Sequence, residues 1–216
     1  MKRVIARCNR PLIMGILNVT PDSFFDGGKH NTIEEAVKHA LLMVDDGANI
    51  IDVGGESTRP FSEPVSVEVE LERVIPVIEG IRSKSYIPIS IDTSKAKVAK
   101  EACKVGADIV NDISGFTFDE YMVDTVSKAG VQAVIMHTKG TPKNMQNNPF
   151  YENVISEITE FFKERIAFAD RHGIEKDRII LDPGIGFGKR VSDNLEIIKH
   201  LKTFKEFDMP IMIGTS

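Results

Sequence analysis

Short apolar runs rich in β-branched residues alternate along the chain with longer segments of helical period. Strands that alternate with helical segments pair in parallel, with the helices covering the sheet. The runs therefore predict seven parallel strands, at residues 13–16, 50–53, 89–92, 109–112, 131–136, 179–182 and 211–213.

The segments between these runs have the spacing of helices with one buried face. From Ile33 to Val44, apolar residues recur at intervals of three and four positions. Thr32 and Glu35 are predicted to form a capping box at the start of this helix. Residues 154–169 repeat the pattern and are predicted to form the longest helix, which Gly173 would end.

A doubly wound sheet and a barrel both fit this alternation, and the strand ends favour the barrel. Nearly every predicted strand ends in a polar residue or glycine, at Asn18, Gly54, Asp92, Asn111, His137, Asp182 and Gly214. A barrel brings all such ends to one face, whereas a doubly wound sheet concentrates its ligand groups at one switch point. We therefore expect a TIM (β/α)8-type parallel barrel. Because a closed barrel has eight strands, we expect it to be incomplete at the C-terminus, lacking the last strand and about two helices.

Composition narrows the class of protein. A chain of 216 residues, 42% of them hydrophobic, predicts one domain spanning 1–216. No apolar window is long enough for a membrane helix and the N-terminus is charged, so we expect a cytoplasmic protein. Cys8 and Cys103 are far apart, which indicates neither a disulfide framework nor a zinc site. A net charge of -5 argues against a nucleic-acid surface, so an anionic ligand needs local cations or a metal.

The glycine-rich run from Gly184 to Lys189 does not fit the standard phosphate-binding motifs. Lys189 occupies the third glycine position of the dinucleotide fingerprint, and Pro183 and Arg190 break the P-loop pattern. The signatures of zinc hydrolases, serine hydrolases and protein kinases are absent. We interpret His137, the one histidine directly after a predicted strand, as structural, because polar loop side chains often serve backbone hydrogen bonds.

Asp92, Asn111 and Asp182 each end an apolar run, where an unpaired carboxylate would cost several kcal/mol. Any one of them could cap a helix or accept hydrogen bonds from loop amides. Three of them converging on one barrel face favour ligand binding instead.

Six motifs in order, each at a strand end, carry a resemblance to a known family. They are Asn18–Gly28, Gly54–Pro60, Ser90–Thr93, Asn111–Gly115, Met136–His137 and Asp182–Lys189. From about residue 12 to its last residue, the chain resembles dihydropteroate synthase. The resemblance implies condensation of 6-hydroxymethyl-7,8-dihydropterin diphosphate with p-aminobenzoate, giving 7,8-dihydropteroate and diphosphate for folate synthesis.

The resemblance also implies the pterin contacts. Asp182, Asn111 and Asp92 would hold the pterin, because carboxylates accept from its ring donors and an amide both donates and accepts. Ile113 and Met136 would pack on its two faces. Asp92 and Asp182 would also favour positive charge on the pterin methylene as diphosphate leaves.

The remaining site residues would serve the other substrate groups. Arg59 is implied as a catalytic residue that binds the diphosphate, with Thr58 adding a hydroxyl donor. Asn18 would be the protein ligand of Mg²⁺, which keeps several waters. Taken alone, Arg59 reads as a solvated loop arginine and Asn18 as a turn residue. The glycine- and proline-containing loops after the first and second predicted strands would also order around p-aminobenzoate. Phe24, Asp26 and Pro60 would then line its pocket.

Relatives of this kind continue beyond Gly214–Ser216 to a lysine and then to an arginine and a histidine that contact the substrates. We therefore expect a truncated enzyme with weak or undetectable turnover, whose open edges favour a homodimer. A pterin-binding methyltransferase barrel is one alternative, but it has no diphosphate to hold and would not need the loops at Thr20–Phe24 and Ser57–Pro60. A non-catalytic pterin-binding fragment is the other.

Overall fold

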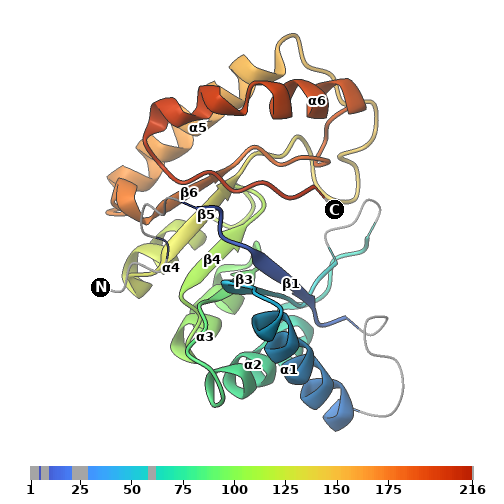
Figure 1. Cartoon of the computed structure of the whole chain (residues 1–216). Coiled ribbons are helices and arrows are strands. Elements are labelled where there is room, and N and C mark those ends of the chain that lie inside the picture. Colours follow the sequence, from blue (N-terminus) through green and yellow to red (C-terminus); the bar gives the residue numbers. More distant parts are fainter. Residues whose placement is uncertain (1–4, 6–9, 21–28, 58–61, 216) are drawn as a thin grey trace.

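The computed structural model describes residues 5, 10–20, 29–57 and 62–215, with the side chains of residues 29–32 excepted. Its core is a parallel sheet whose strands follow one another in chain order (Figure 1). The six strands are β1 (Met14–Asn18), β2 (Ile50–Gly54), β3 (Ile89–Asp92), β4 (Ile109–Asp112), β5 (Gln132–Met136) and β6 (Ile179–Asp182).

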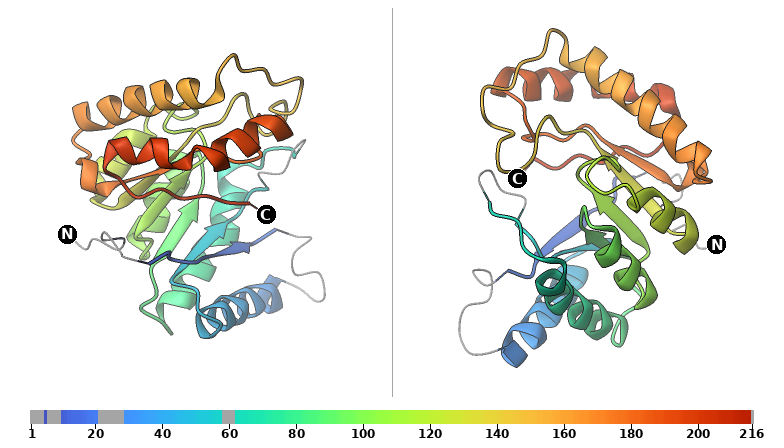
Figure 2. Two further views of the ribbon diagram at one scale, coloured as in Figure 1. Left: turned by 45° about the horizontal axis from the view of Figure 1, so that its top comes forward. Right: turned by 180° about the vertical axis from the view of Figure 1, so that it is seen from behind.

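Helices join consecutive strands and cover the outside of the curved sheet (Figure 2). Neighbouring helices pack on one another in the pairs α1–α2, α2–α3, α3–α4 and α5–α6. The helices are α1 (Lys29–Asp45), α2 (Val67–Arg82), α3 (Ala96–Lys104), α4 (Met122–Ala129), α5 (Val154–Arg171) and α6 (Val191–Lys199), with 3-10 turns at Lys176–Arg178 and Leu201–Phe207. Strand and helix order are those of the TIM-barrel type, as predicted.

Each strand presents alternate side chains to the two faces of the sheet. The outward residues, such as Ile51, Val53 and Ile91, are fully buried against the helices. The inward residues at the amino ends form a second apolar cluster of Ile50, Ile109, Val134 and Ile180, against which Met14 and Met212 pack. Inward residues nearer the carboxyl ends are polar, so the barrel interior has an apolar level and a polar level.

The seventh predicted strand is wrong as a strand. Residues 211–213 contribute a single parallel bridge, between Leu181 and Ile211. The Leu181 N–H donates to Pro210 O at 2.9 Å, and the Met212 N–H donates to Leu181 O at 2.8 Å. Pro210 has no N–H of its own to extend the ladder. No strand in the described part of the chain pairs with the other edge of this segment, so the barrel is not closed.

The predicted helix at residues 33–44 is confirmed, but its start is not. Helix α1 begins at Lys29, so Thr32 lies inside it and the capping box with Glu35 is wrong. Lys29 to Thr32 include no proline or glycine, so nothing in the sequence prevents the extra turn.

The predicted long helix is confirmed as α5, with 18 residues the longest of the described helices. Asn153 caps it by accepting the Ser156 N–H at 3.0 Å. Gly173 follows its end with φ of 80°, a conformation that glycine adopts without strain.

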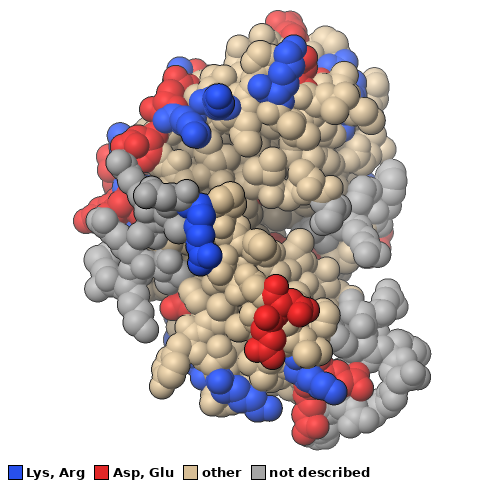
Figure 3. Space-filling model, viewed as in Figure 1, with Lys and Arg blue, Asp and Glu red and all other residues tan. Residues whose placement is uncertain are grey.

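The surface shows mixed charge. On the face in Figure 3, acidic and basic side chains are interspersed toward the edges, and the centre of that face has few of either. A cavity of about 660 Å³ lies at the amino ends of β1 and β6, lined mostly by apolar side chains such as Met14, Ile50 and Ile180. Among the described helices, none is long and apolar enough to cross a membrane.

Candidate active site

The polar level of the barrel interior brings the predicted pterin residues together. The parallel register pairs Asp92 with Asn111, and Met136 with Asp182. It also pairs Asn18 with Gly54. The carboxyl ends of these strands therefore lie side by side, and their inward side chains face one interior space.

Asn111 has a fixed contact across the interior. Its Nδ2 donates to Asp52 Oδ2 at 3.0 Å, passing over β3. Asn111 Oδ1 and Asp52 Oδ1 are buried without a hydrogen-bond partner among the described residues. Ser90, the register partner of Asp52, lies close enough to lower the pKa of Asp52, although no hydrogen bond of normal geometry joins them. Burial is the larger effect and raises the pKa of Asp52 overall.

Gly54 leaves space between Asn18 and Asp92. A Cβ atom at position 54 would lie 3.5 Å from Asn18 Oδ1 and 3.5 Å from Asp92 Oδ2. Burial, followed by the nearby Asp52 carboxylate, raises the pKa of Asp92 well above its usual range. Hydrogen-bond donors or positive charge from a ligand would reverse that effect. This opening is therefore suited to a ligand with N–H groups or cationic character.

Asp182 is held by the turn that follows β6. The Gly184 N–H donates to Asp182 Oδ1 at 2.7 Å. A side chain at Gly184 would place its Cβ 2.1 Å from His137 O, and the φ of 68° also requires glycine. Burial raises the pKa of Asp182 to about 6, against the opposing effects of the Gly184 N–H and the Lys189 charge. Asp182 is therefore mainly ionised at neutral pH.

Lys189 is a buried cation that sequence reasoning considered only as part of a nucleotide motif. Its Nζ donates to His137 O at 3.0 Å and to Phe187 O at 2.9 Å, and its side chain is 3% exposed. Burial lowers its pKa to about 7. Lys189 thereby joins the end of β5 to the loop after β6, close to Asp182.

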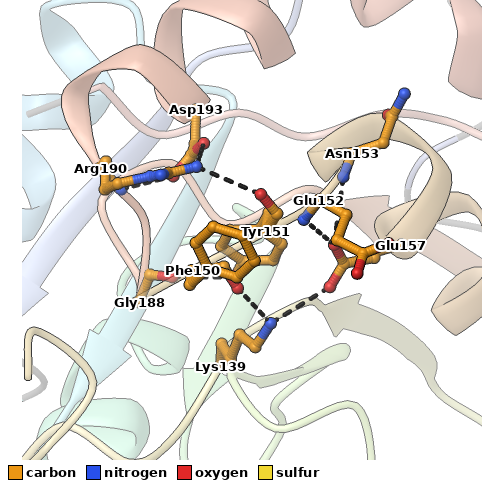
Figure 4. Close-up of polar contacts among 9 residues, drawn as sticks. All are labelled: Lys139, Phe150, Tyr151, Glu152, Asn153, Glu157, Gly188, Arg190 and Asp193. Carbon is orange, nitrogen blue, oxygen red and sulfur yellow. Dashed lines mark hydrogen bonds and ion pairs between the residues drawn. The ribbon is translucent and has the colours of Figure 1, made fainter. Parts of the chain in front are cut away.

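A second set of contacts ties the same two loops together (Figure 4). Tyr151 donates its hydroxyl to Gly188 O at 2.8 Å, and Arg190 bridges Tyr151 O at 3.4 Å and Asp193 at 2.8 Å. His137 packs edge-on against Phe161, with ring centroids 5.0 Å apart. Burial lowers the pKa of His137 to about 3, so its ring is neutral at neutral pH.

The other predicted site residues divide into two groups. Ile113 and Met136 are buried at the ends of β4 and β5, 7% and 4% exposed. Thr58, Arg59, Phe24, Asp26 and Pro60 lie outside the described residues.

The segments flanking residues 58–61 are anchored by charged contacts. Glu56 accepts the Val65 N–H at 2.8 Å and Lys95 Nζ at 2.6 Å, and Lys95 also pairs with the buried Glu70. Sequence reasoning missed this cluster, and it also missed Asp52. The available signal for Asp52 was a lone acid within the apolar run 50–53.

Comparisons with known proteins agree with the fold and the polar interior. The family of pterin binding enzymes matches residues 14–216. The dihydropteroate synthase of Escherichia coli strain K12 is 49% identical over 208 residues, which are 96% of this chain and 73% of that protein. The chain belongs to the dihydropteroate synthase family.

Solved structures of this family superpose closely. A Xanthomonas albilineans dihydropteroate synthase with 4-aminobenzoic acid matches with a TM-score of 0.90 and 43% identity, covering 96% of this chain and 74% of that one. The enzyme from the same organism in complex with 7,8-dihydropteroate gives 0.86 and 41%, covering 96% and 73%. The predicted resemblance and the predicted barrel class are therefore confirmed, as is assignment of the chain to a transferase family of folate biosynthesis.

Proposed function

We propose that this chain uses the polar level of its barrel as the pterin site of a dihydropteroate synthase. The amine of p-aminobenzoate forms the new bond to the pterin methylene carbon, while the bond from that carbon to the diphosphate oxygen breaks. Diphosphate leaves with the electron pair, and the amine loses a proton. The observation that supports this most is the set of inward oxygen atoms at Asp92, Asn111 and Asp182.

The three residues suit the donor edge of a pterin. Asn111 Oδ1 is buried and unpartnered in the described part of the chain, so a ligand N–H would satisfy it. Asp182 has a second carboxylate oxygen besides the one bound to Gly184, and Asp92 faces the gap above Gly54. Prepositioned carboxylates of this kind stabilise positive charge on the methylene as the leaving group departs. Ile113 and Met136 would contact the pterin faces.

The diphosphate end of the site depends on Asn18 and on residues beyond the described ranges. Asn18 Oδ1 lies beside the opening at Gly54, and a magnesium ion takes few protein ligands, so this oxygen fits the proposed metal. In the described ranges, no group of three or more His, Cys, Asp or Glu could hold a metal ion. Bound Mg²⁺ would neutralise charge on the departing diphosphate. Arg59 and Thr58 would add donors to its oxygen atoms, and Phe24, Asp26 and Pro60 would line the p-aminobenzoate pocket.

Release of diphosphate from the two substrates and Mg²⁺ tests this function. We expect release that requires p-aminobenzoate and stops when the metal is chelated. Arg59→Ala should weaken binding of the pterin diphosphate while sparing the bare pterin alcohol. Equal losses for both ligands would refute the assignment of Arg59. Binding of pterin without any release of diphosphate would instead support the non-catalytic alternative.

A homodimer and a cytoplasmic location also remain proposals. Exposed apolar residues on α6, Val191, Leu195 and Ile198, suit an association of two copies. Sedimentation of the purified chain would test the dimer, and cell fractionation would test the location.

A further inference from the structure

Asp52 is an inward residue of β2 in the polar level of the barrel, and neither the family resemblance nor the proposed function gives it a role. It is 5% exposed. Among the described residues, its carboxylate accepts one hydrogen bond, the 3.0 Å contact from Asn111 Nδ2 to its Oδ2. That contact joins β2 to β4, two strands that do not pair in the sheet.

The contact fixes which end of the Asn111 amide faces the pterin space. An amide can turn over, exchanging its oxygen and its NH₂ group, and only its hydrogen-bond partners decide which orientation is stable. A carboxylate accepts but does not donate, so Asp52 accepts from the NH₂ group of Asn111. The opposite end, Asn111 Oδ1, is then buried and left without a partner in the described structure, and a ligand N–H would satisfy it.

The Asp52 carboxyl group does not stabilise the fold. Its Oδ1 is buried without a partner in the described ranges, and burial raises the pKa of its carboxyl group. A buried carboxyl group with an unsatisfied oxygen costs free energy. The inward neighbours at the same level, Ile16 and Ser90, provide no cation to offset that cost.

We propose that Asp52 is a positioning residue for the pterin end of the site, which orients the Asn111 amide so that its oxygen faces the ligand. This inference rests on the proposed function, because it needs Asn111 to accept from a pterin N–H. Asp52 acts through Asn111 and does not itself touch the pterin.

A double-mutant cycle on the full 216-residue chain tests the proposal, with calorimetric titration of 6-hydroxymethylpterin as the measurement. Asp52→Ala should weaken binding by roughly 10-fold to 100-fold, the range for hydrogen bonds to charged groups. Asp52→Asn keeps an acceptor oxygen for Asn111 Nδ2 and should stay within about 3-fold of the parent chain. In the Asn111→Ala background, Asp52→Ala should have almost no further effect, because coupled residues are not additive.

The controls separate positioning from packing. Gln132→Ala removes a buried polar side chain of β5, three strands from Asp52, that bonds the backbone of Ile5, and it should leave binding unchanged. Thermal melts would identify variants that do not fold, and Asp52→Ser would replace Asp52→Ala if the latter fails to fold.

Equal losses from Asp52→Ala with and without Asn111 would overturn the inference, as would an Asp52→Asn variant as weak as Asp52→Ala. Absence of pterin binding by the parent chain would instead contradict the proposed function.

Discussion

The apolar level and the polar level of the barrel interior are built on the same strands. Side chains of the apolar level pack fully on one another, whereas those of the polar level keep hydrogen-bonding groups that the described part of the protein does not pair. At the amino ends, Ile50, Ile109 and Ile180 pack on one another. Two residues further along the same strands stand Asp52, Asn111 and Asp182, with unpartnered oxygen atoms or raised pKa values. Inward positions recur every second residue, so a shift of two residues along a strand leads from the apolar level, which stabilises the fold, to the polar level, which is suited to a ligand.

Asp112 shows that burial and acidity alone do not mark the ligand level. It follows Asn111 directly, so its side chain points outward from the barrel. Its two oxygen atoms accept the N–H groups of Ser114 and Phe116, both at 2.9 Å. An acid that shapes a turn is thus fully satisfied within the chain, whereas Asp52 and Asn111 each keep an unpartnered oxygen.

The largest effect on pterin binding should come from removing an acid of the polar level. Asp182→Ala should weaken binding of 6-hydroxymethyl-7,8-dihydropterin by about 2 to 5 kcal/mol, because the ligand donors lose their charged acceptor. Titration calorimetry measures this loss. Asp170→Ala, an exposed acid on α5, is the control and should change nothing. Unchanged affinity in Asp182→Ala would remove Asp182 from the pterin site.

Substitutions in the apolar level should lower stability and leave pterin binding almost unchanged. Ile109 is completely buried in the apolar cluster, so Ile109→Ala should lower the free energy of unfolding by about 2 to 4 kcal/mol. Pterin affinity of the folded variant should stay close to that of the parent chain. Denaturant titration gives the first quantity, with Leu42→Ala as control because Leu42 is 50% exposed. A binding loss as large as that of Asp182→Ala would mean that the two levels are not separate.

The sequence was sufficient to predict the outward face of the sheet and the apolar level of the barrel interior. Apolar runs and helical spacing identified six strands and located α5, because burial imposes those periods directly. It also identified Asp92, Asn111 and Asp182, since a polar residue that ends an apolar run is conspicuous. The segment 211–213 has the same composition as a strand, but strand formation also requires pairing partners, which composition does not reveal.

The sequence could not reveal which polar groups satisfy one another. Asp52 and Asn111 are far apart in the chain, and their contact depends on the curvature that brings β2 and β4 together across β3. Likewise, Lys189 reads as one more surface lysine until its two carbonyl partners are known. Such contacts follow from the tertiary fold and leave no local period in the sequence.

A smaller effect is expected from the cation that joins the two loops beside Asp182. Lys189→Met keeps the length of the side chain but leaves His137 O and Phe187 O without their donor, so stability should fall by about 1 to 3 kcal/mol. The pKa of Asp182 should rise, because the Lys189 charge lowers it. Thermal melts and the pH dependence of pterin binding measure the two effects, with the exposed Lys199→Met as control. A stable variant with an unchanged pH profile would contradict this role.

The smallest effect concerns pH, which should act in opposite directions on binding and on stability. Burial raises the pKa of Asp182 and of Asp112 to about 6, above the ordinary value of 3.8. Between these values the folded state holds more protons than the unfolded state. The contribution of these groups to stability is therefore fully present below about pH 4 and is lost as the pH rises through about 6.

Pterin binding needs the ionised Asp182, so affinity should instead fall below pH 6. The expected decrease approaches tenfold per pH unit, or about 1.4 kcal/mol. Calorimetry at pH 5, 6 and 7 would measure binding, and Asp182→Asn should abolish this dependence. Denaturant titration of Asp112→Asn over the same range would isolate stability, because Asp112 has no predicted ligand contact. Affinity that is constant from pH 7 to pH 5 would show that Asp182 does not bind the pterin as a carboxylate.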